Sequence, residues 1–172
     1  MENDIIIRNA NIEDLKEVAS IAVNSWKVAY KGIIDEEYLK NMSVEETYQK
    51  IKEGYQKNKY IVAELKSEIV GFCRYTLNYS KSDDNADGEI IALYVKPNLK
   101  YNGIGTKMFS YVMNEFKENG SYRIVLGCLK ENFSSRKFYE KMGGKVYTEK
   151  WFERGNKEYK EVFYEYLIKQ TE

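Results

Sequence analysis

The feature that most constrains this chain is a strand, a glycine-containing loop and a long helix in immediate succession. The apolar run 89–95 is followed by Pro97, the only proline in the chain. Proline cannot donate to a sheet ladder, so it suits the end of a strand. Gly103 and Gly105 follow, and apolar residues then recur on one helical face over 103–118. Helix N-terminal amides and the helix dipole bind phosphate, so this junction predicts a site for a phosphate-bearing ligand.

The glycine spacing excludes the two most familiar phosphate loops. A dinucleotide fingerprint requires a third glycine at position 108, where Met108 stands. A nucleoside-triphosphate loop requires a glycine ahead of Gly-Lys-Ser or Gly-Lys-Thr, and the sequence contains neither triplet. A tight strand-to-helix turn would also explain these glycines, so the junction alone does not identify the ligand.

The surrounding pattern predicts a mixed α/β (α+β) fold. Apolar and β-branched runs indicate seven strands, over residues 5–7, 60–65, 69–79, 89–95, 124–129, 146–152 and 159–168. Helical spacing indicates four helices, over about 12–31, 35–55, 103–118 and 133–142, the second with a further cap at Ser43. This order indicates one mixed sheet of about seven strands with four helices packed on its faces. A chain of 172 residues without linkers is expected to form a single domain, residues 1–172.

Composition excludes several classes of protein. The 27 basic residues equal the 27 acidic ones, whereas nucleic-acid-binding proteins are usually strongly basic. Histidine is absent, which excludes histidine triads and histidine metal sites, and we expect no metal. Cys73 and Cys128 lie in apolar runs without metal or disulfide spacing and are expected to be buried free thiols.

Location and origin are suggested by simple features of the sequence. The first residues lack the apolar stretch of a signal peptide, and no run approaches the ~20 apolar residues that span a bilayer. A cytoplasmic protein with no membrane partner is therefore expected. Only five of the 27 basic residues are arginine, a bias typical of AT-rich microbial genomes, and we expect a bacterial source.

A second motif follows the strand 124–129. Asn132, Ser135 and Tyr139 are offset by three and seven residues, so on a helix they share one face. Phe138 and Met142 would face the core, and Gly143-Gly144 would end the helix.

Together the two motifs resemble the GNAT superfamily of N-acetyltransferases. Its main motif, Val-x-Pro followed by Gln/Arg-x-x-Gly-x-Gly/Ala, corresponds to Val95-Lys96-Pro97 and Lys100-Tyr101-Asn102-Gly103-Ile104-Gly105. Its later motif corresponds to Asn132, Ser135 and the segment from Phe138-Tyr139 to Gly143-Gly144. Lys100 replaces the usual Gln or Arg, and Gly144 replaces the usual Phe. The order of elements matches along nearly the whole chain, and the resemblance implies the GNAT fold with a mostly antiparallel sheet.

The resemblance implies acetyl-CoA as the co-substrate. Its pyrophosphate would be bound by the amides of Lys100, Tyr101, Asn102, Gly103, Ile104, Gly105 and Thr106. Amides near Leu93, Tyr94 and Val95 would pair with the pantetheine arm and the acetyl carbonyl, and Asn132 and Ser135 would line the same arm. Tyr139 would protonate the departing thiolate, and either Glu89 or a chain of water molecules would accept the proton of the amine.

The resemblance further implies direct attack, in a ternary complex, by a primary amine of a small molecule. The acceptor site would include Trp26, Tyr30 and Tyr38, in a segment similar to that of bacterial polyamine acetyltransferases. Acidic residues in the loop before Glu89 would either attract a cationic amine or simply form a solvated surface.

Three questions stay open at this level. The acceptor could instead be a protein or peptide, and the chain could be a catalytically silent acyl-CoA-binding regulator. A homodimer could form through the aromatic final hairpin, whose ring-bearing residues include Trp151, Phe152, Tyr159, Phe163, Tyr164 and Tyr166.

Overall fold

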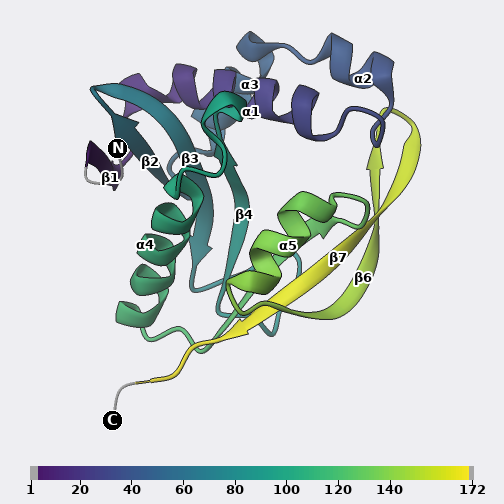
Figure 1. Ribbon diagram of the computed structural model, residues 1–172. Helices are drawn as coiled ribbons and strands as arrows, with labels where there is room; N and C mark the ends of the chain where they lie inside the picture. The colour runs from purple at the N-terminus through teal and green to yellow at the C-terminus, as the bar shows by residue number, and fades with distance from the viewer. Residues whose placement is uncertain (1–3, 171–172) are drawn as a thin grey trace.

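A seven-stranded sheet organises the molecule (Figure 1). The computed structural model describes residues 4–170. Along the sheet the strands run in the order β1-β2-β3-β4-β5-β7-β6. Their bounds are β1 Ile5–Asn9, β2 Lys59–Leu65, β3 Glu68–Leu77, β4 Gly88–Val95, β5 Arg123–Leu129, β6 Lys145–Arg154 and β7 Lys157–Leu167. Every neighbouring pair is antiparallel except β4 and β5, so the expected mixed and mostly antiparallel sheet is confirmed.

Within residues 4–170, five α-helices accompany the sheet, where the sequence predicted four. They are α1 Leu15–Ala29, α2 Glu36–Asn41, α3 Val44–Gly54, α4 Ile104–Glu118 and α5 Phe133–Lys141, with short 3-10 segments η2 Ile12–Asp14 and η3 Pro97–Leu99. The difference arises at Ser43, whose Oγ accepts a hydrogen bond from the Glu46 amide at 3.3 Å. The further cap predicted at Ser43 is therefore confirmed, and it begins α3 as a helix separate from α2.

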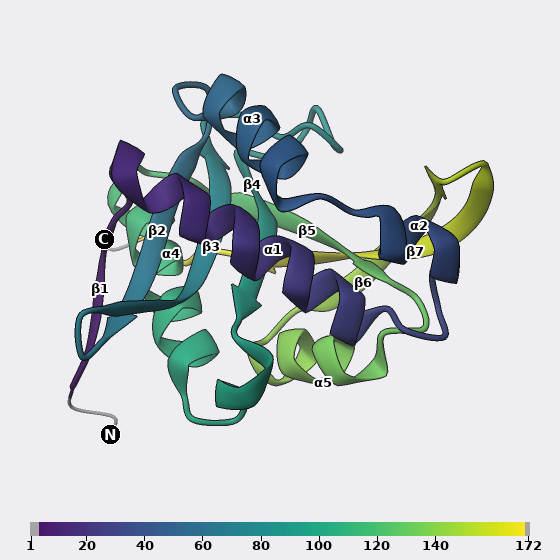
Figure 2. The same ribbon diagram turned by 90° about the horizontal axis from the view of Figure 1, so that it is seen from above.

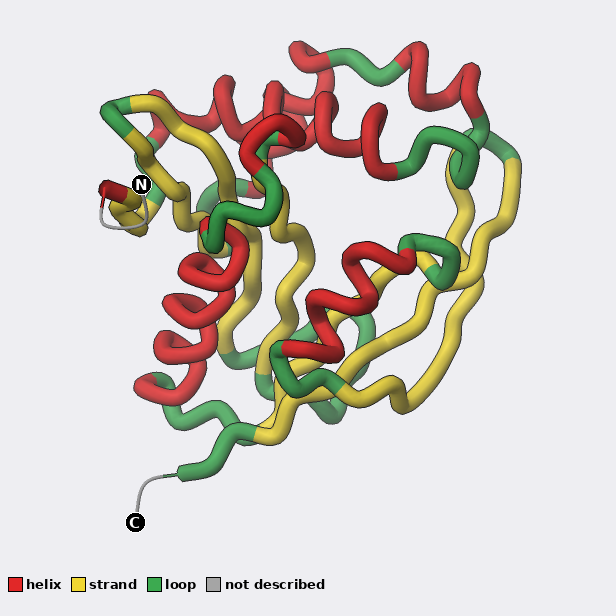
Figure 3. Tube along the Cα trace, viewed as in Figure 1, coloured by secondary structure: helices red, strands yellow, loops and turns green. Residues whose placement is uncertain are grey.

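The helices form layers on the two faces of the sheet (Figures 2 and 3). Alternation along β2 shows how the layers arise, because neighbouring side chains point to opposite faces. Ile61 and Ala63 belong to the core under α4, whereas Tyr60 and Val62 belong to the core under α1 and α3. Cys73 and Cys128 are buried free thiols, as predicted, and burial raises the pKa of Cys128 to about 12.

The parallel pair β4 and β5 opens partway along its length. Within residues 4–170, the register joins β4 residues 88–90 to β5 residues 124–126 and goes no further. A bulge between Arg74 and Tyr75 of β3 shifts the register on the other side of β4, leaving Ile91 without a partner. From Ile91 onward, β4 therefore presents one backbone edge to the space between the two strands.

The final hairpin keeps most of its aromatic rings inside the molecule. Phe163, Tyr164 and Tyr166 are buried, and only Trp151 of the six aromatics is largely exposed, at 65%. The hairpin therefore offers less apolar surface for a homodimer than its sequence suggested. Within residues 4–170, no helix combines the length and apolar character needed to cross a membrane.

We expect Gly88→Ala to destabilise the sheet at the point where β4 and β5 meet. An added Cβ would lie 2.5 Å from Cε1 of Phe116 and 2.7 Å from the carbonyl oxygen of Thr76. Phe116 is fully buried. Overpacking of this kind costs about 1–3 kcal/mol of unfolding free energy, which denaturant titration would measure. Gly54→Ala, whose Cβ meets only the Asn58 amide at 3.3 Å, is the control, and an equal loss in both variants would contradict the expectation.

Candidate active site

A cavity of about 370 Å³ lies where α1, α2 and α3 cover the strands from β2 to β7. Its volume falls in the range of small-molecule sites. Its wall is divided about equally between polar and apolar surface. The side chains that supply rings, hydroxyls and charges are Trp26, Tyr30, Tyr38, Thr47, Tyr60, Phe72, Arg74, Ser82, Glu89, Tyr94, Phe152, Arg154, Glu161 and Phe163.

The three side chains predicted for acceptor binding, Trp26, Tyr30 and Tyr38, all line this cavity. Trp26 Nε1 donates to the Tyr94 hydroxyl at 2.9 Å, and the hydroxyls of Tyr30 and Tyr94 are 3.2 Å apart. The rings of Trp26 and Tyr30 also meet edge to face, with centroids 4.8 Å apart. Burial raises the pKa of Tyr30 and of Tyr94, so this end of the cavity has a neutral, ordered wall.

Glu89, the predicted base, is 5% exposed and also lines the cavity. Its Oε2 accepts from the Ser80 hydroxyl at 2.9 Å and from the amides of Lys81 and Ser82 at 2.7 and 3.2 Å. Its Oε1 accepts from the Ser82 hydroxyl at 2.6 Å. A carboxylate offers roughly four acceptor sites, so four donors nearly fill them. In this arrangement Glu89 holds the loop between β3 and β4 against the sheet.

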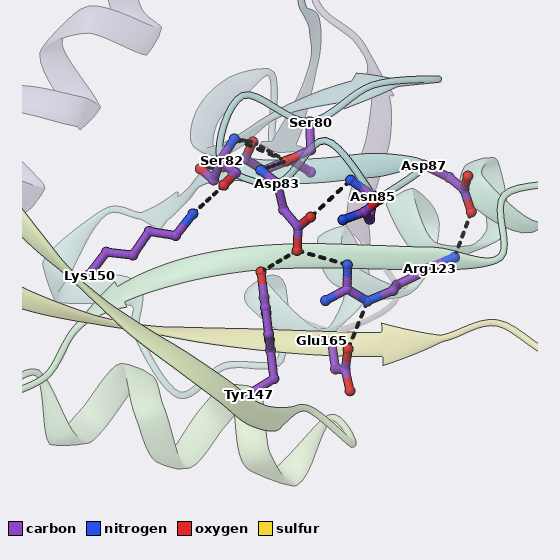
Figure 4. A network of polar contacts seen from close by, with 10 residues as sticks. Ser80, Ser82, Asp83, Asn85, Asp87, Arg123, Tyr147, Lys150 and Glu165 are labelled. Carbon is purple, nitrogen blue, oxygen red and sulfur yellow. Dashed lines mark hydrogen bonds and ion pairs between the residues drawn. The ribbon is translucent and has the colours of Figure 1, made fainter.

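The same loop is fixed from its other side by a polar network (Figure 4). Asp83 accepts from Arg123 at 2.8 Å and from the Tyr147 hydroxyl at 2.9 Å, and Arg123 also donates to Glu165 at 2.8 Å. The Arg123 guanidinium lowers the pKa of Asp83 to about 2. Asp87 accepts from the amides of residues 122 and 123. Asp83 and Asp87 are therefore engaged in holding the loop and β5, and only Glu89 of the acidic stretch lines the cavity.

Glu161 is a cavity carboxylate that the sequence interpretation missed. It stands on β7, two residues before Phe163, so both side chains leave the strand on the cavity face. Within residues 4–170 its carboxylate makes no hydrogen bond or ion pair. Burial raises its pKa, opposed by Arg154 and Lys150 and reinforced by Glu89. The cavity thus contains a half-buried carboxylate whose lone pairs are available to a ligand.

The predicted phosphate site lies at the N-terminus of α4. Gly103 caps the helix in the left-handed conformation, with φ 76°, which glycine adopts without a steric cost. The Lys107 amide makes the first helical bond, to the Gly103 carbonyl at 3.0 Å. The amides of residues 103–106 have no helical partner one turn earlier and are oriented for an anion. This arrangement suits a pyrophosphate without requiring charged side chains.

The second motif builds α5 beside this site. Asn132 caps the helix, and its Oδ1 accepts from the Ser135 amide at 3.3 Å, which leaves its Nδ2 as the available donor. Tyr139 packs between Phe138 and Tyr164, with ring centroids 5.5 and 6.0 Å away. Burial, followed by the nearby Cys128 and Tyr94, raises the pKa of Tyr139 well above its usual value. Tyr139 is therefore a neutral phenol across the physiological range, with a proton that it can donate.

Tyr139 lies on the α5 side of the sheet but is close enough to residues of the cavity wall to affect their pKa values and to be affected by them. Tyr94 belongs to the cavity wall, and Tyr139 affects the pKa of Tyr30 in the same wall. The α5 side and the cavity therefore meet where β4 and β5 open. A group bound between the strands would lie next to Tyr139 on one side and to the cavity on the other.

Comparison with known proteins identifies the family to which this chain belongs. Residues 22–144 match the model of the acetyltransferase (GNAT) family. The chain is 31% identical over 157 residues to a spermidine N(1)-acetyltransferase of Thermoplasma acidophilum, covering 83% of this chain and 89% of that protein. It is 25% identical over 158 residues to an N-acetyltransferase of Bacillus subtilis, covering 92% of this chain and 90% of the relative.

Among solved structures, the chain is similar to the PaiA N-acetyltransferase of Thermoplasma acidophilum in complex with coenzyme A. The TM-score is 0.74 at 25% identity, and the match covers 95% of this chain and 99% of the other. The protein belongs to the acetyltransferase (GNAT) family. It is an N-acetyltransferase, which confirms the resemblance drawn from its two motifs.

Proposed function

We propose that this protein transfers an acetyl group from acetyl-CoA to a primary amine of a small molecule, by direct attack in a ternary complex. The observation that carries the proposal is the opening between β4 and β5, with an anion-binding helix terminus and Tyr139 on one side and an acceptor-sized cavity on the other. The spermidine N(1)-acetyltransferase among its relatives makes polyamines the first amines to test. We propose that the single domain 1–172 acts in the cytoplasm.

The residues at the start of α4 suit the pyrophosphate of acetyl-CoA, because the left-handed Gly103 turns the free amides of 103–106 outward. Acetyl-CoA supplies the thioester carbonyl that the amine attacks. Lys100 adds a cation near this terminus, and Nδ2 of Asn132 can donate to the pantetheine arm. The unpaired edge of β4 around Leu93 offers amides that stabilise a developing oxyanion.

We expect Gly103→Ala to weaken acetyl-CoA binding by about tenfold. A Cβ in the left-handed region costs about 1–2 kcal/mol per residue, which would displace the amides of the loop. Gly120→Ala is a matched control, since Gly120 has φ 77° and lies beyond the other end of α4. Calorimetric titration with acetyl-CoA would measure both variants. Equal acetyl-CoA affinity in the two variants would show that the Gly103 loop does not bind acetyl-CoA.

Two carboxylates could take the proton of the attacking amine. Glu89 was predicted for this role, but its acceptor sites are occupied by the loop. Glu161 has the freer carboxylate, and its raised pKa suits proton exchange nearer to neutral pH. We propose Glu161 as the proton acceptor and Glu89 as the residue that positions the loop.

The test of the proposed function is CoA release from acetyl-CoA across a panel of amines. The panel includes spermidine, spermine, aminoglycosides, free amino acids and short peptides, with an enzyme-only blank for the two cysteines. Turnover with small amines and not with peptides is the expected result. Turnover with peptides alone would support the protein-directed alternative. Tight acetyl-CoA binding without turnover on any amine would favour a regulatory acyl-CoA-binding protein.

A further inference from the structure

Two polar atoms at one end of the cavity have no partner within the described chain. The Nε of Arg74 and the hydroxyl of Tyr60 are both buried, and neither forms a hydrogen bond with any group in residues 4–170. Both side chains line the cavity. They are register partners on β3 and β2, and the Arg74 guanidinium carbon lies 5.9 Å from the centre of the Tyr60 ring. The two unsatisfied donors therefore form one cluster.

Buried donors without a partner are rare in folded proteins, and a pair of them in a cavity indicates a missing acceptor. The positive charge of Arg74 also indicates that an acceptor group is missing from the cavity. Arg8, Arg123 and Arg136 each form an ion pair with an acidic side chain. Within residues 4–170, the other two arginines, Arg74 and Arg154, form none, and both line the cavity. Of these two, only Arg74 has a buried nitrogen without a hydrogen-bond partner. A half-buried guanidinium facing a cavity without an acidic partner is stabilised by an anionic ligand.

We propose that Arg74 and Tyr60 form a carboxylate subsite, and that the acceptor is an amino-acid-class molecule carrying a carboxylate as well as the primary amine. A guanidinium matches a carboxylate in shape and charge, and the tyrosine hydroxyl adds a second donor. This inference rests on the proposed function and narrows its acceptor. Polyamines fit this end of the cavity less well, because a second cation would approach Arg74.

The neighbouring charges support the assignment. Lys81 lies near enough to Arg74 that the guanidinium, after burial, lowers the pKa of Lys81, while Glu89 opposes this effect. Four loop donors already occupy the Glu89 carboxylate. Those donors are uncharged and do not cancel the negative charge of Glu89, but the cations Arg74 and Lys81 exceed it by one at this end of the cavity. The unpaired Glu161 stands on β7, at the other side of the opened strands, with Arg154 and Lys150 near it. An acceptor with its carboxylate at Arg74 would direct its amine toward Glu161, the proposed proton acceptor.

The transfer itself leaves the carboxylate unchanged. The ammonium group first releases one proton to solvent. The neutral amine nitrogen then forms a bond to the acetyl carbon as the carbon–sulfur bond breaks, and a second nitrogen proton passes to the carboxylate base. The thiolate takes a proton from Tyr139, which regains one from solvent. The product is an N-acetyl amino acid, which keeps its negative charge at Arg74 and has lost its positive one.

The experiment compares free amino acids with the amines made by removing their carboxyl groups, using kcat and KM. The wild-type protein is expected to prefer an amino acid over its decarboxylated amine by about tenfold to a hundredfold, the range of a charge-assisted hydrogen bond. In Arg74→Gln this ratio is expected to fall toward one, mainly through KM for the amino acid. Arg74→Lys should restore part of it, and Tyr60→Phe, which removes only one hydroxyl, should reduce it less.

A binding measurement keeps the test independent of turnover. Calorimetric titration of an N-acetyl amino acid into the protein with CoA should show binding in the wild type and a loss of about tenfold or more in Arg74→Gln. Wild-type preference for spermidine over every amino acid, together with no calorimetric binding, would overturn the subsite. Carboxylate binding without acetylation of any amine would instead support the subsite and contradict the proposed function.

Discussion

Tyr139→Phe is expected to lower turnover about a hundredfold, the lower end of the range for general acid–base catalysis, with nearly unchanged acetyl-CoA affinity. The hydroxyl of Tyr139 has no acceptor among residues 4–170, so its proton is available to a departing thiolate. Burial raises the pKa of Tyr139 well above its usual value, so the group stays protonated at the pH where the enzyme works. Phenylalanine keeps the packing against Phe138 and Tyr164 and removes only the proton donor.

Single-turnover kinetics with saturating acetyl-CoA would measure this effect on chemistry, and calorimetry would measure the affinity. Tyr122→Phe is the matched control, because Tyr122 is 59% exposed and lies at the far end of β5 from α5. Because a raised pKa moves deprotonation to higher pH, wild-type turnover should show no alkaline loss from Tyr139 below about pH 10. Equal turnover in Tyr139→Phe and the wild type would remove Tyr139 from the mechanism.

The parts of the site that could be predicted from sequence are those built by local chain geometry. The left-handed Gly103, the helix that follows it and the Asn132 cap depend on residues within a few positions of one another. The turn of the final hairpin, where Gly155 and Asn156 both have positive φ, is local in the same way. Spacing alone encodes such features, and the structure reproduces them.

The parts that could not be predicted depend on strands distant in sequence. Arg74 and Glu161 reach one cavity only because β3 and β7 join the same sheet with β4 and β5 between them. One signal was present for Arg74, which is a lone charge inside the apolar run 69–77. Buried charges without partners are rare, so such a residue deserves a functional interpretation. For Glu161 the signal was weaker. Val162 and Tyr164 point to the core, and the alternation of side chains along a strand indicated only that Glu161 lies on the opposite face.

Glu161→Gln is expected to lower turnover about a hundredfold near neutral pH and to remove the acidic limb of the rate–pH profile. The base must be ionised to accept a proton, so wild-type turnover should rise with pH through the pKa of Glu161. Burial raises that pKa, so the rise should lie at higher pH than for an ordinary glutamate. Glutamine keeps the size of the side chain and cannot accept the proton, which leaves only solvent to take it.

Glu89→Gln distinguishes the roles of Glu89 and Glu161, because it should change stability and KM, whereas Glu161→Gln should change the rate–pH profile. A glutamine at position 89 presents an amide nitrogen to the donors of Lys81 and Ser82, so the loop should detach, the melting temperature should fall and KM should rise. The acidic limb should remain, since Glu161 is intact. If Glu89→Gln instead removes the limb while Glu161→Gln keeps it, the loop carboxylate is the base after all. Its four hydrogen bonds would then have to rearrange when the acceptor enters the cavity.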